Sequence, residues 1–270
     1  MAIKVIIMDI DGTLVNDEKV ITPLTKETLL KAQEKGVRLI LASGRPTSGL
    51  LKLAEELDMR NHHGLFVCFN GSKVVDCQSH ETLYNHAISV EDSKAILEHL
   101  KNFKARPMFD KDEYMFVHDV YADNIQHESR MGCYKLCEVD DLEAACQFPL
   151  NKILISAKPC YLKQHFQEMA EPFSNEVHSM FTAPYYYEFN ALGVDKATAL
   201  KHVISFYGSD RTEVIVFGDA HNDITMMQFA GTGVAMGNAV SEVKNIADIV
   251  TDTNDNDGIV QALKELKLCL

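Results

Sequence analysis

The sequence predicts an α/β fold in which a doubly wound parallel sheet, Rossmann-like in its alternation, is interrupted by a smaller α+β domain. Two observations carry this prediction. Short apolar runs alternate with amphipathic segments at both ends of the chain, as in parallel sheets that are covered by helices on both faces. Between residues 83 and 188 the strand-like segments are spaced at longer intervals. We therefore assign residues 1–82 and 189–270 to one core and residues 83–188 to an inserted domain.

The first part of the core is predicted to hold three apolar strands separated by two helices. The first helix begins at Thr22-Pro23, because Thr is a good N-cap and Pro suits the first helical position, and it ends at Gly36. The second helix, residues 49–57, repeats leucine on one face. The three strands are residues 3–8, 37–42 and 65–69.

The remaining elements follow the same patterns. The inserted domain is expected to have helices over 89–103 and 161–172 and strands over 113–118, 134–139 and 152–157. We interpret the aromatic run 185–188 as an ordinary strand rather than a substrate-selecting segment. The core then resumes with a helix through Tyr207, a helix over 224–230, and strands over 214–217, 233–236 and 248–251.

Charge limits the classes of partner. The 270 residues are 46% hydrophobic and 24% charged, which is ordinary for a globular protein. Lys and Arg number 26 against 39 Asp and Glu, a net charge of −13 that disfavours nucleic acid and membrane surfaces as partners. A small anionic substrate would meet the same repulsion, so its site needs Lys, Arg or a metal ion. The sequence does not indicate an oligomeric state.

The cysteines and the apolar segments point to the cytoplasm. The seven cysteines include no C-x-x-C pair, and we expect them to be reduced. The first apolar run is short and ends at Asp9, unlike a signal peptide, and no stretch approaches the ~18 apolar residues of a membrane span. We therefore expect a cytoplasmic protein.

Polar residues follow the predicted core strands where each strand ends. In an open α/β sheet these positions share one crevice, so we expect the side chains to converge. Each Asp taken alone is more typical of a turn or a helix N-cap, but the set together favours a site. Carboxylates within a few Å repel, and Mg²⁺, which prefers oxygen ligands and often shares a substrate phosphate, relieves the conflict. The residues are Asp9, Asp11, Ser43, Gly44, Asp219, Asn222 and Asp223.

Four segments in this order resemble the motifs of the haloacid-dehalogenase-like (HAD-like) hydrolases. The endings GVAMGNA at 233–239 and DGI at 257–259 are similar to the Cof-type branch, and within it to the YidA-type sugar phosphatases. The resemblance covers the core almost end to end and implies a HAD-like core fold with an α+β cap domain of type C2. The four segments are DIDGT at 9–13, ASGR at 42–45, GVDK at 193–196 and GDAHND at 218–223.

The resemblance implies a Mg²⁺-dependent phosphatase that hydrolyses small phosphorylated metabolites, above all sugar phosphates, through an aspartyl-phosphate. Asp9 would be the nucleophile and Asp11 the general acid and then the general base. The metal would be held by Asp9, the Asp11 site and Asp219, with Asp223 supporting the metal shell. The phosphoryl group would be bound by Ile10, Ser43, Gly44, Lys196 and Asn222.

Several alternatives stay open. The same core could carry a phosphomutase, or a protein that binds phosphorylated metabolites without turnover. Arg45 could contact the inserted domain or the substrate, or pair with an acidic neighbour. Asn70-Gly71 resembles a family turn near the phosphate and is equally typical of a plain β-turn. We interpret His221 as a surface position rather than an acid-base group.

Overall fold

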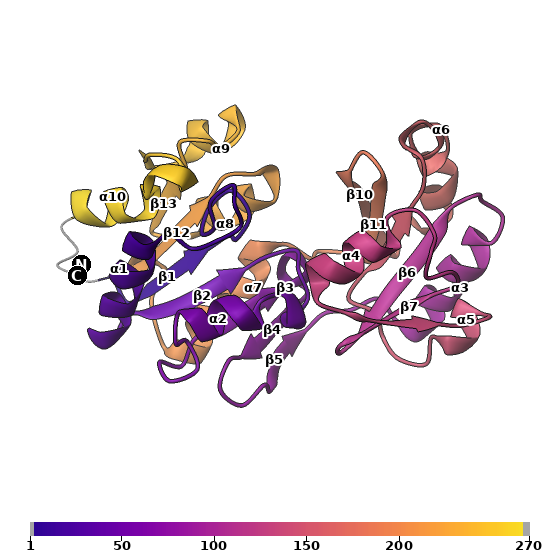
Figure 1. Ribbon diagram of the computed structural model, residues 1–270, viewed down its shortest axis with the longest axis horizontal. Helices are drawn as coiled ribbons and strands as arrows, with labels where there is room; N and C mark the ends of the chain where they lie inside the picture. Colours follow the sequence, from indigo (N-terminus) through magenta and orange to yellow (C-terminus); the bar gives the residue numbers. More distant parts are fainter. Residues whose placement is uncertain (1–2, 267–270) are drawn as a thin grey trace. The chain divides into compact units, whose positions relative to one another are not determined.

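The computed structural model describes residues 3–266 and divides the chain into two compact units. The first unit joins the segment up to Tyr84 to the segment from Asp195 onward, and the second is Asn85–Val194 (Figure 1). Within the described residues, no helix combines the length and the apolar character that crossing a membrane requires.

The unit boundaries lie later in the chain than the predicted residues 82 and 188. Strand β5 (Thr82–Asn85) is the outermost strand of the first sheet, so the chain leaves the first unit only at its end. Strand β11 (Tyr186–Ala191) is an inner strand of the second sheet, and the chain therefore returns to the first unit after it. The aromatic run at 185–188 lies largely in β11, as the strand prediction requires.

The first unit is built on an eight-stranded sheet with the order β14-β13-β12-β1-β2-β3-β4-β5. Pairing is parallel from β14 to β3, and β4 runs antiparallel to β3. The predicted core strands are all present, whereas β4 and β5 were not predicted. The strands are β1 (Val5–Met8), β2 (Arg38–Ala42), β3 (Leu65–Cys68), β4 (Lys73–Asp76), β12 (Val214–Gly218), β13 (Thr232–Ala235) and β14 (Ile249–Val250).

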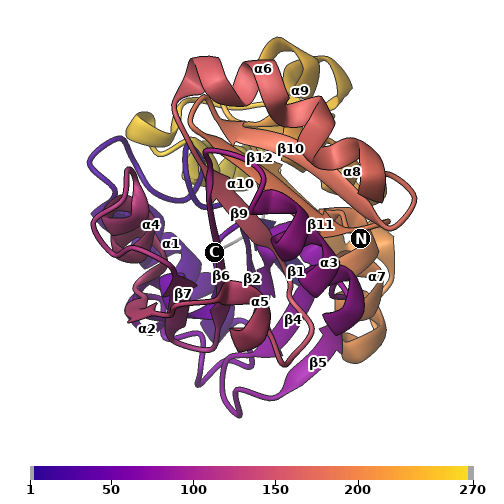
Figure 2. The same ribbon diagram turned by 90° about the vertical axis from the view of Figure 1, so that its right-hand side faces the viewer.

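Helices cover both faces of this sheet, as predicted. Side chains alternate along β1, so Ile6 and Met8 pack into the core under one set of helices while Val5 and Ile7 pack under the other. In Figure 2, α1 and α2 of the first set lie to the left of β1 and β2, and α7 and α8 of the second set lie to the right. The first set is α1 (Pro23–Glu34), α2 (Leu51–Glu56) and α10 (Gly258–Glu265), and the second is α7 (Lys196–Tyr207), α8 (Ile224–Phe229) and α9 (Ser241–Ile246).

Local sequence sets the first helices. The Thr22 side chain accepts a hydrogen bond from the N–H of Thr25, so α1 begins with the predicted N-cap and with Pro23 at its first position. Gly36, just past its end, has a φ of 87°, which glycine adopts without strain. The helix predicted over 49–57 is instead a 3₁₀ turn at 47–49 followed by α2.

The second unit has a six-stranded sheet with the order β10-β11-β9-β6-β7-β8. Helices α3 and α6 pack on one face and α4 on the other. The predicted strands appear as β7, β8 and β9 and the predicted helices as α3 and α6. The elements not yet placed are α3 (Val90–Leu100), β6 (Arg106–Lys111), β7 (Tyr114–Val117), α4 (Ile125–Gly132), β8 (Lys135–Glu138), α5 (Leu142–Ala145), β9 (Ile153–Ser156), α6 (Pro159–Ala170) and β10 (Val177–Ala183).

Candidate active site

The carboxyl ends of three neighbouring strands bring the motif residues together in the first unit. Strand β1 lies between β2 and β12, and Met8 pairs in register with Leu41 of β2 and Phe217 of β12. Asp9, Ser43 and Asp219 therefore follow at the same edge of the sheet. The N–H of Asp9 continues the ladder and donates to the Phe217 carbonyl at 3.0 Å.

Lys196 is the fixed positive charge of this edge. It is the first residue of α7 and is fully buried. Its Nζ donates to Asp9 Oδ1 at 2.5 Å, to Asp223 Oδ1 at 2.6 Å and to the carbonyl of Ala42 at 2.9 Å. Burial lowers the pKa of Lys196, but the carboxylates of Asp223 and Asp9 outweigh it and hold the pKa above its ordinary value. The lysine therefore stays charged.

Asp9, Asp219 and Asp223 form a group of carboxylates whose nearest oxygens all lie within 4.8 Å of one another. Burial is the largest influence on the pKa of Asp9. Lys196 opposes it, but Asp223 and Asp219 add to it, so this pKa is raised. Burial raises the pKa of Asp219 to about 6, against a hydrogen bond from Thr13. Lys196 pairs with two of these three carboxylates, Asp9 and Asp223, so their combined charge is not balanced by it. An oxygen-only donor set of this kind suits Mg²⁺.

The Asp223 carboxylate is already fully engaged by the protein. One oxygen accepts from Lys196, and the other accepts from the N–H groups of Asp219 and Ala220 at 2.9 and 3.0 Å. Asp223 is also completely buried. It therefore fixes both the lysine and the loop that carries Asp219. These contacts suit a residue that supports the metal ligands better than a residue that binds the metal directly.

Gly12 and Thr13, which follow β1, contact Asp219, which follows the neighbouring strand β12. Thr13 Oγ1 donates to Asp219 Oδ1 at 2.8 Å. Gly12 has a φ of +82°, and a Cβ placed on it would lie 2.4 Å from Asp219 Oδ2. Asn238 Nδ2 donates to the Gly12 carbonyl at 2.7 Å. Asn238 had no predicted role, although it lies in the segment GVAMGNA at 233–239, which resembles the Cof-type branch.

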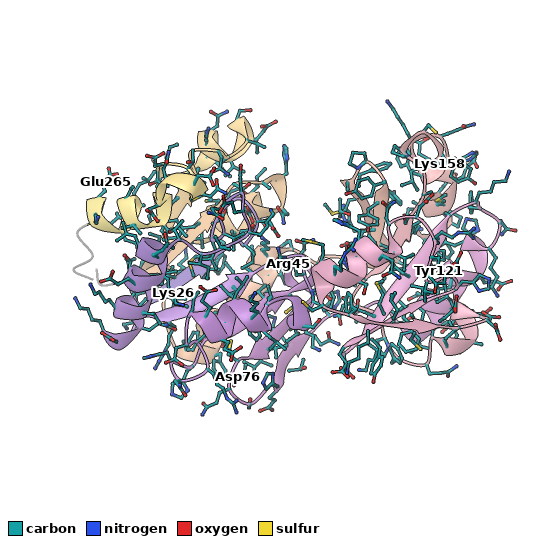
Figure 3. All side chains as sticks on the ribbon, viewed as in Figure 1. Lys26, Arg45, Asp76, Tyr121, Lys158 and Glu265 are labelled. Atoms are coloured by element: carbon teal, nitrogen blue, oxygen red, sulfur yellow. The ribbon has the colours of Figure 1, made fainter. Side chains whose placement is uncertain are left out.

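Asp11 lies apart from the carboxylate group. Both of its oxygens accept from the Arg45 guanidinium at 2.8 to 3.0 Å, and Lys19 Nζ lies 3.0 Å from Oδ1. Burial raises the pKa of Asp11, but Arg45 and Lys19 outweigh it and hold the pKa below its ordinary value. Of the three options for Arg45, labelled in Figure 3, the structure shows pairing with an acidic neighbour. Of the expected metal set of Asp9, Asp11 and Asp219, the carboxylates of Asp9 and Asp219 belong to the close group, whereas the Asp11 carboxylate pairs with Arg45.

The residues expected to bind phosphate lie around the same strand ends. Ser43 is buried, and its N–H donates to the Val67 carbonyl at 2.9 Å. Ile10 is fully buried beside Asp9, and Gly44 follows Ser43 in the loop after β2. Asn222 Nδ2 donates to Asn70 Oδ1 at 3.0 Å.

His221 is a surface residue, as interpreted from the sequence. Its side chain is 67% exposed, and Nε2 lies 3.6 Å from Glu242 Oε1. Among the residues that the structure describes, its ion-pair partner is Glu242 and not a member of the carboxylate group, so its position gives no support to an acid-base role.

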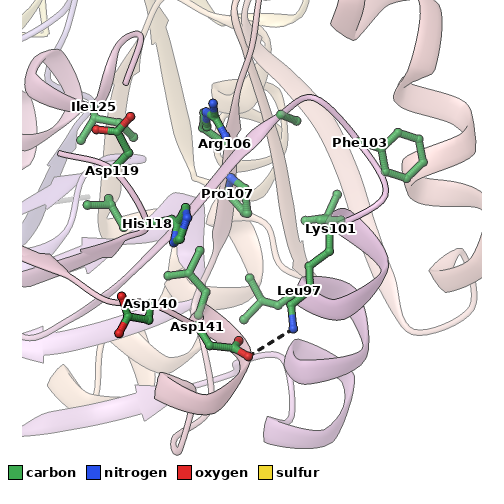
Figure 4. Close-up of a pocket in the computed structure, with 14 residues that line it drawn as sticks. Leu97, Lys101, Phe103, Arg106, Pro107, His118, Asp119, Ile125, Asp140 and Asp141 are labelled. Atoms are coloured by element: carbon green, nitrogen blue, oxygen red, sulfur yellow. Dashed lines mark hydrogen bonds and ion pairs between the residues drawn. The ribbon is translucent and has the colours of Figure 1, made fainter. Parts of the chain in front are cut away.

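A separate cavity of about 330 Å³ lies in the second unit (Figure 4). It is lined mainly by the end of α3, the start of β6, the end of β7 with the loop after it, and the loop before α5. The Lys101 ammonium on its wall donates to Asp141 at 3.3 Å and to Glu143 at 3.2 Å, so this charge is balanced by the protein. The lining includes no residue that the motifs pointed to.

Comparison with known proteins agrees with the motifs. The family model of haloacid dehalogenase-like hydrolases matches residues 6–263. The 5-amino-6-(5-phospho-D-ribitylamino)uracil phosphatase YcsE of Bacillus subtilis is 30% identical, over 97% of this chain and 95% of its own. A haloacid dehalogenase-like hydrolase from Bacteroides thetaiotaomicron has a TM-score of 0.93 and 33% identity, over 98% of this chain and 99% of its own. The sugar phosphatase BT4131 has a TM-score of 0.81 and 26% identity, over 98% and 99%. The chain belongs to the haloacid dehalogenase-like hydrolases, a family of enzymes whose relatives compared here include phosphatases.

Proposed function

We propose that the protein is a Mg²⁺-dependent phosphatase that hydrolyses small phosphorylated metabolites, above all sugar phosphates, in the cytoplasm. One observation carries this proposal. The Asp9 carboxylate, at the end of β1, is held through one oxygen by the buried ammonium of Lys196 and lies in one group with Asp219. This arrangement presents a carboxylate nucleophile beside a fixed positive charge and a cation site, which are the requirements of phosphoryl transfer.

The residues that would hold Mg²⁺ are Asp9 and Asp219, with Asp223 supporting them. When bound, the ion would neutralise the carboxylates and the charge on the phosphoryl oxygens. Lys196 supplies positive charge independently of the ion, because its two carboxylate partners keep it protonated. Ser43, Gly44, Ile10 and Asn222 would offer hydrogen bonds to the phosphoryl group.

In the first step Asp9 attacks phosphorus, and the bond between phosphorus and the alcohol oxygen breaks. Asp11 gives its proton to the departing alcohol oxygen. In the second step water attacks the phosphorus of the aspartyl-phosphate, Asp11 takes the water proton, and inorganic phosphate leaves while Asp9 is restored. Arg45 and Lys19 hold Asp11 ionised, so Asp11 must leave this pairing before it can deliver a proton.

We propose that the second unit acts as the cap that selects the alcohol part of the substrate. The relatives act on different alcohols: YcsE is named for a ribitylaminouracil phosphate and YbhA of Escherichia coli for pyridoxal phosphate, while BT4131 is called a sugar phosphatase. What they share is the phosphomonoester. The reaction class therefore follows from the core, and the alcohol has to be found by experiment.

The test is phosphate release from p-nitrophenyl phosphate and a panel of sugar phosphates, with Mg²⁺, with EDTA and with Asp9→Asn. We expect turnover with Mg²⁺ only, and almost none with Asp9→Asn, which keeps the size of the side chain but removes the nucleophile. No phosphate release from any substrate by the wild type, or full activity in Asp9→Asn, would refute the proposal. Isomerised product without free phosphate would indicate a phosphomutase, and tight binding without turnover a binding protein.

A further inference from the structure

We propose that Asn70 is a positioning residue that orients the Asn222 amide in the phosphoryl site. This inference rests on the proposed function, because it takes Asn222 as a phosphoryl-binding group. Asn70 lies in the turn Phe69–Gly71, between β3 and β4. The sequence left two interpretations of this turn open, a plain β-turn and a turn near the phosphate.

The turn has an unusual backbone. Its three residues all have positive φ: 51° at Phe69, 55° at Asn70 and 105° at Gly71. Glycine and asparagine tolerate such values, but a phenylalanine in this region is rare and strained. The surrounding structure must therefore impose the conformation.

Hydrogen bonds tie the turn to the loop that follows β2. The N–H of Phe69 donates to the Arg45 carbonyl at 3.1 Å, and the N–H of Asn70 donates to the Ser43 carbonyl at 3.0 Å. Both acceptors belong to the ASGR motif. The strained turn is thus fixed to the loop that we expect to bind phosphate.

The turn also packs against the first residues of α7. A Cβ placed on Gly71 would lie 2.1 Å from the Asp195 carbonyl oxygen and 3.0 Å from the Lys196 nitrogen. Only glycine permits this approach, and it places the turn directly against the residue that holds Asp9. The positions of Ser43 and Lys196 therefore depend on the same three residues.

The Asn70 side chain completes the link. Its Oδ1 accepts from Asn222 Nδ2 at 3.0 Å. A Cβ on Gly44 would lie 3.1 Å from Asn70 Nδ2, so the amide sits against the Gly44 backbone. An amide nitrogen carries two N–H groups in one plane, and donating one of them to Asn70 fixes the direction of the other.

A plain turn does not account for this side chain. Asparagine in a simple turn commonly bonds to its own backbone two residues on. Here the amide instead bonds to a residue 152 positions away. The turn thus joins the second motif and the fourth motif through Asn70 and the start of α7 through Gly71.

The test measures binding of inorganic phosphate to the full chain by isothermal titration calorimetry with Mg²⁺. Asn70→Gly removes the amide and keeps a residue suited to a φ of 55°. We expect its phosphate affinity to fall about tenfold, the effect of one ordinary hydrogen bond. Asn222→Ala should cause a similar loss, and the double variant little more than either, because the two side chains act as one unit. In turnover, Asn70→Gly should raise KM more than it lowers kcat.

His80→Gly is the matched control, since His80 is exposed and has a φ of 60° in a turn outside the site. Its phosphate affinity should equal that of the wild type. Asn70→Ala provides a second variant without the amide if Asn70→Gly does not fold, and thermal unfolding identifies the folded proteins. Unchanged phosphate binding in the folded Asn70 variant, or fully additive losses in the double variant, would overturn the inference. Phosphate binding without turnover in the wild type would overturn the proposed function alone.

Discussion

Replacing Lys196 by methionine should destabilise the first unit strongly, and more at pH 8 than at pH 5. The substitution keeps an unbranched side chain that is one atom shorter, and it removes the ammonium that pairs with both the Asp9 and the Asp223 carboxylates. Breaking a buried pair by removing one partner costs about 3–5 kcal/mol. With an unfolding slope of roughly 3 kcal/mol per M urea for a unit of this size, the urea midpoint should fall by about 1–2 M.

The direction of the pH effect follows from the pKa of Asp9. Burial already raises this pKa although Lys196 opposes it, so without the lysine the pKa rises further. A carboxyl group whose pKa is higher in the folded protein than in the unfolded protein stabilises the folded state at low pH. This stabilisation is lost as the pH rises through the pKa that the group has in the folded protein. The variant should therefore recover part of its stability at pH 5, where the buried carboxyls take up protons.

The measurement is urea unfolding followed by far-ultraviolet circular dichroism at both pH values, with EDTA present. Lys101→Met is the matched control, because Lys101 also has three acidic partners, Glu98, Asp141 and Glu143, but its side chain is 46% exposed. Exposed pairs contribute about 0–1 kcal/mol, so the control should change little. A Lys196→Met midpoint close to that of Lys101→Met, or a larger loss at pH 5 than at pH 8, would refute the reasoning.

Three further predictions concern the site. Gly12→Ala should weaken Mg²⁺ activation, because the added Cβ would meet the Asp219 carboxylate at 2.4 Å. Gly36→Ala should not, because Gly36 has a similar φ of +87° but, apart from its chain neighbours, no described residue lies within 4 Å of the added Cβ. Equal effects of the two substitutions in a Mg²⁺ titration of the rate would contradict this prediction. Arg45→Met should raise the pKa of Asp11 and move the alkaline limb of the pH profile of kcat/KM to higher pH, because Asp11 must be protonated in the first step. An unmoved limb would argue against Asp11 as the general acid. EDTA should abolish phosphate release and added Mg²⁺ should restore it, as a colorimetric phosphate assay can show.

The fold of the core could be predicted because its signals are local. Each signal determines the structure of only a few residues: apolar runs form strands, Thr-Pro begins a helix and glycine ends it. Because the strands pair in parallel, their carboxyl ends then lie at one edge of the sheet. The missed strands lacked such signals. In β6, Pro107 argued against a strand, because proline cannot donate to a ladder. In β10 the burial pattern from Val177 to Ala183 shows no regular alternation, so a period of two was absent from the sequence.

The candidate site could be predicted only at the level of the backbone. The register of β1 with β2 and β12 places Asp9 and Asp219 at one edge of the sheet. The positions of the motifs after the predicted strands already indicate this shared edge. Side-chain direction depends on partners that are distant in sequence. Arg45 binds Asp11, and Asn70 binds Asn222, and neither pairing has a local signal.

Asp9 and Asp11 acquire opposite pKa shifts although one residue separates them. Asp9 is buried at a strand end among carboxylates, which raises its pKa, while Asp11 lies on the following turn with Arg45 and Lys19, which lower it. An attacking carboxylate must be ionised and a proton donor must be protonated, so both shifts oppose the proposed first step. Asp9 therefore needs further positive charge at the carboxylate group, and Asp11 needs to separate from Arg45. If the cation that is bound with the phosphorylated substrate supplies the first change and the arrival of the leaving alcohol the second, then neither residue is reactive until the substrate is in place.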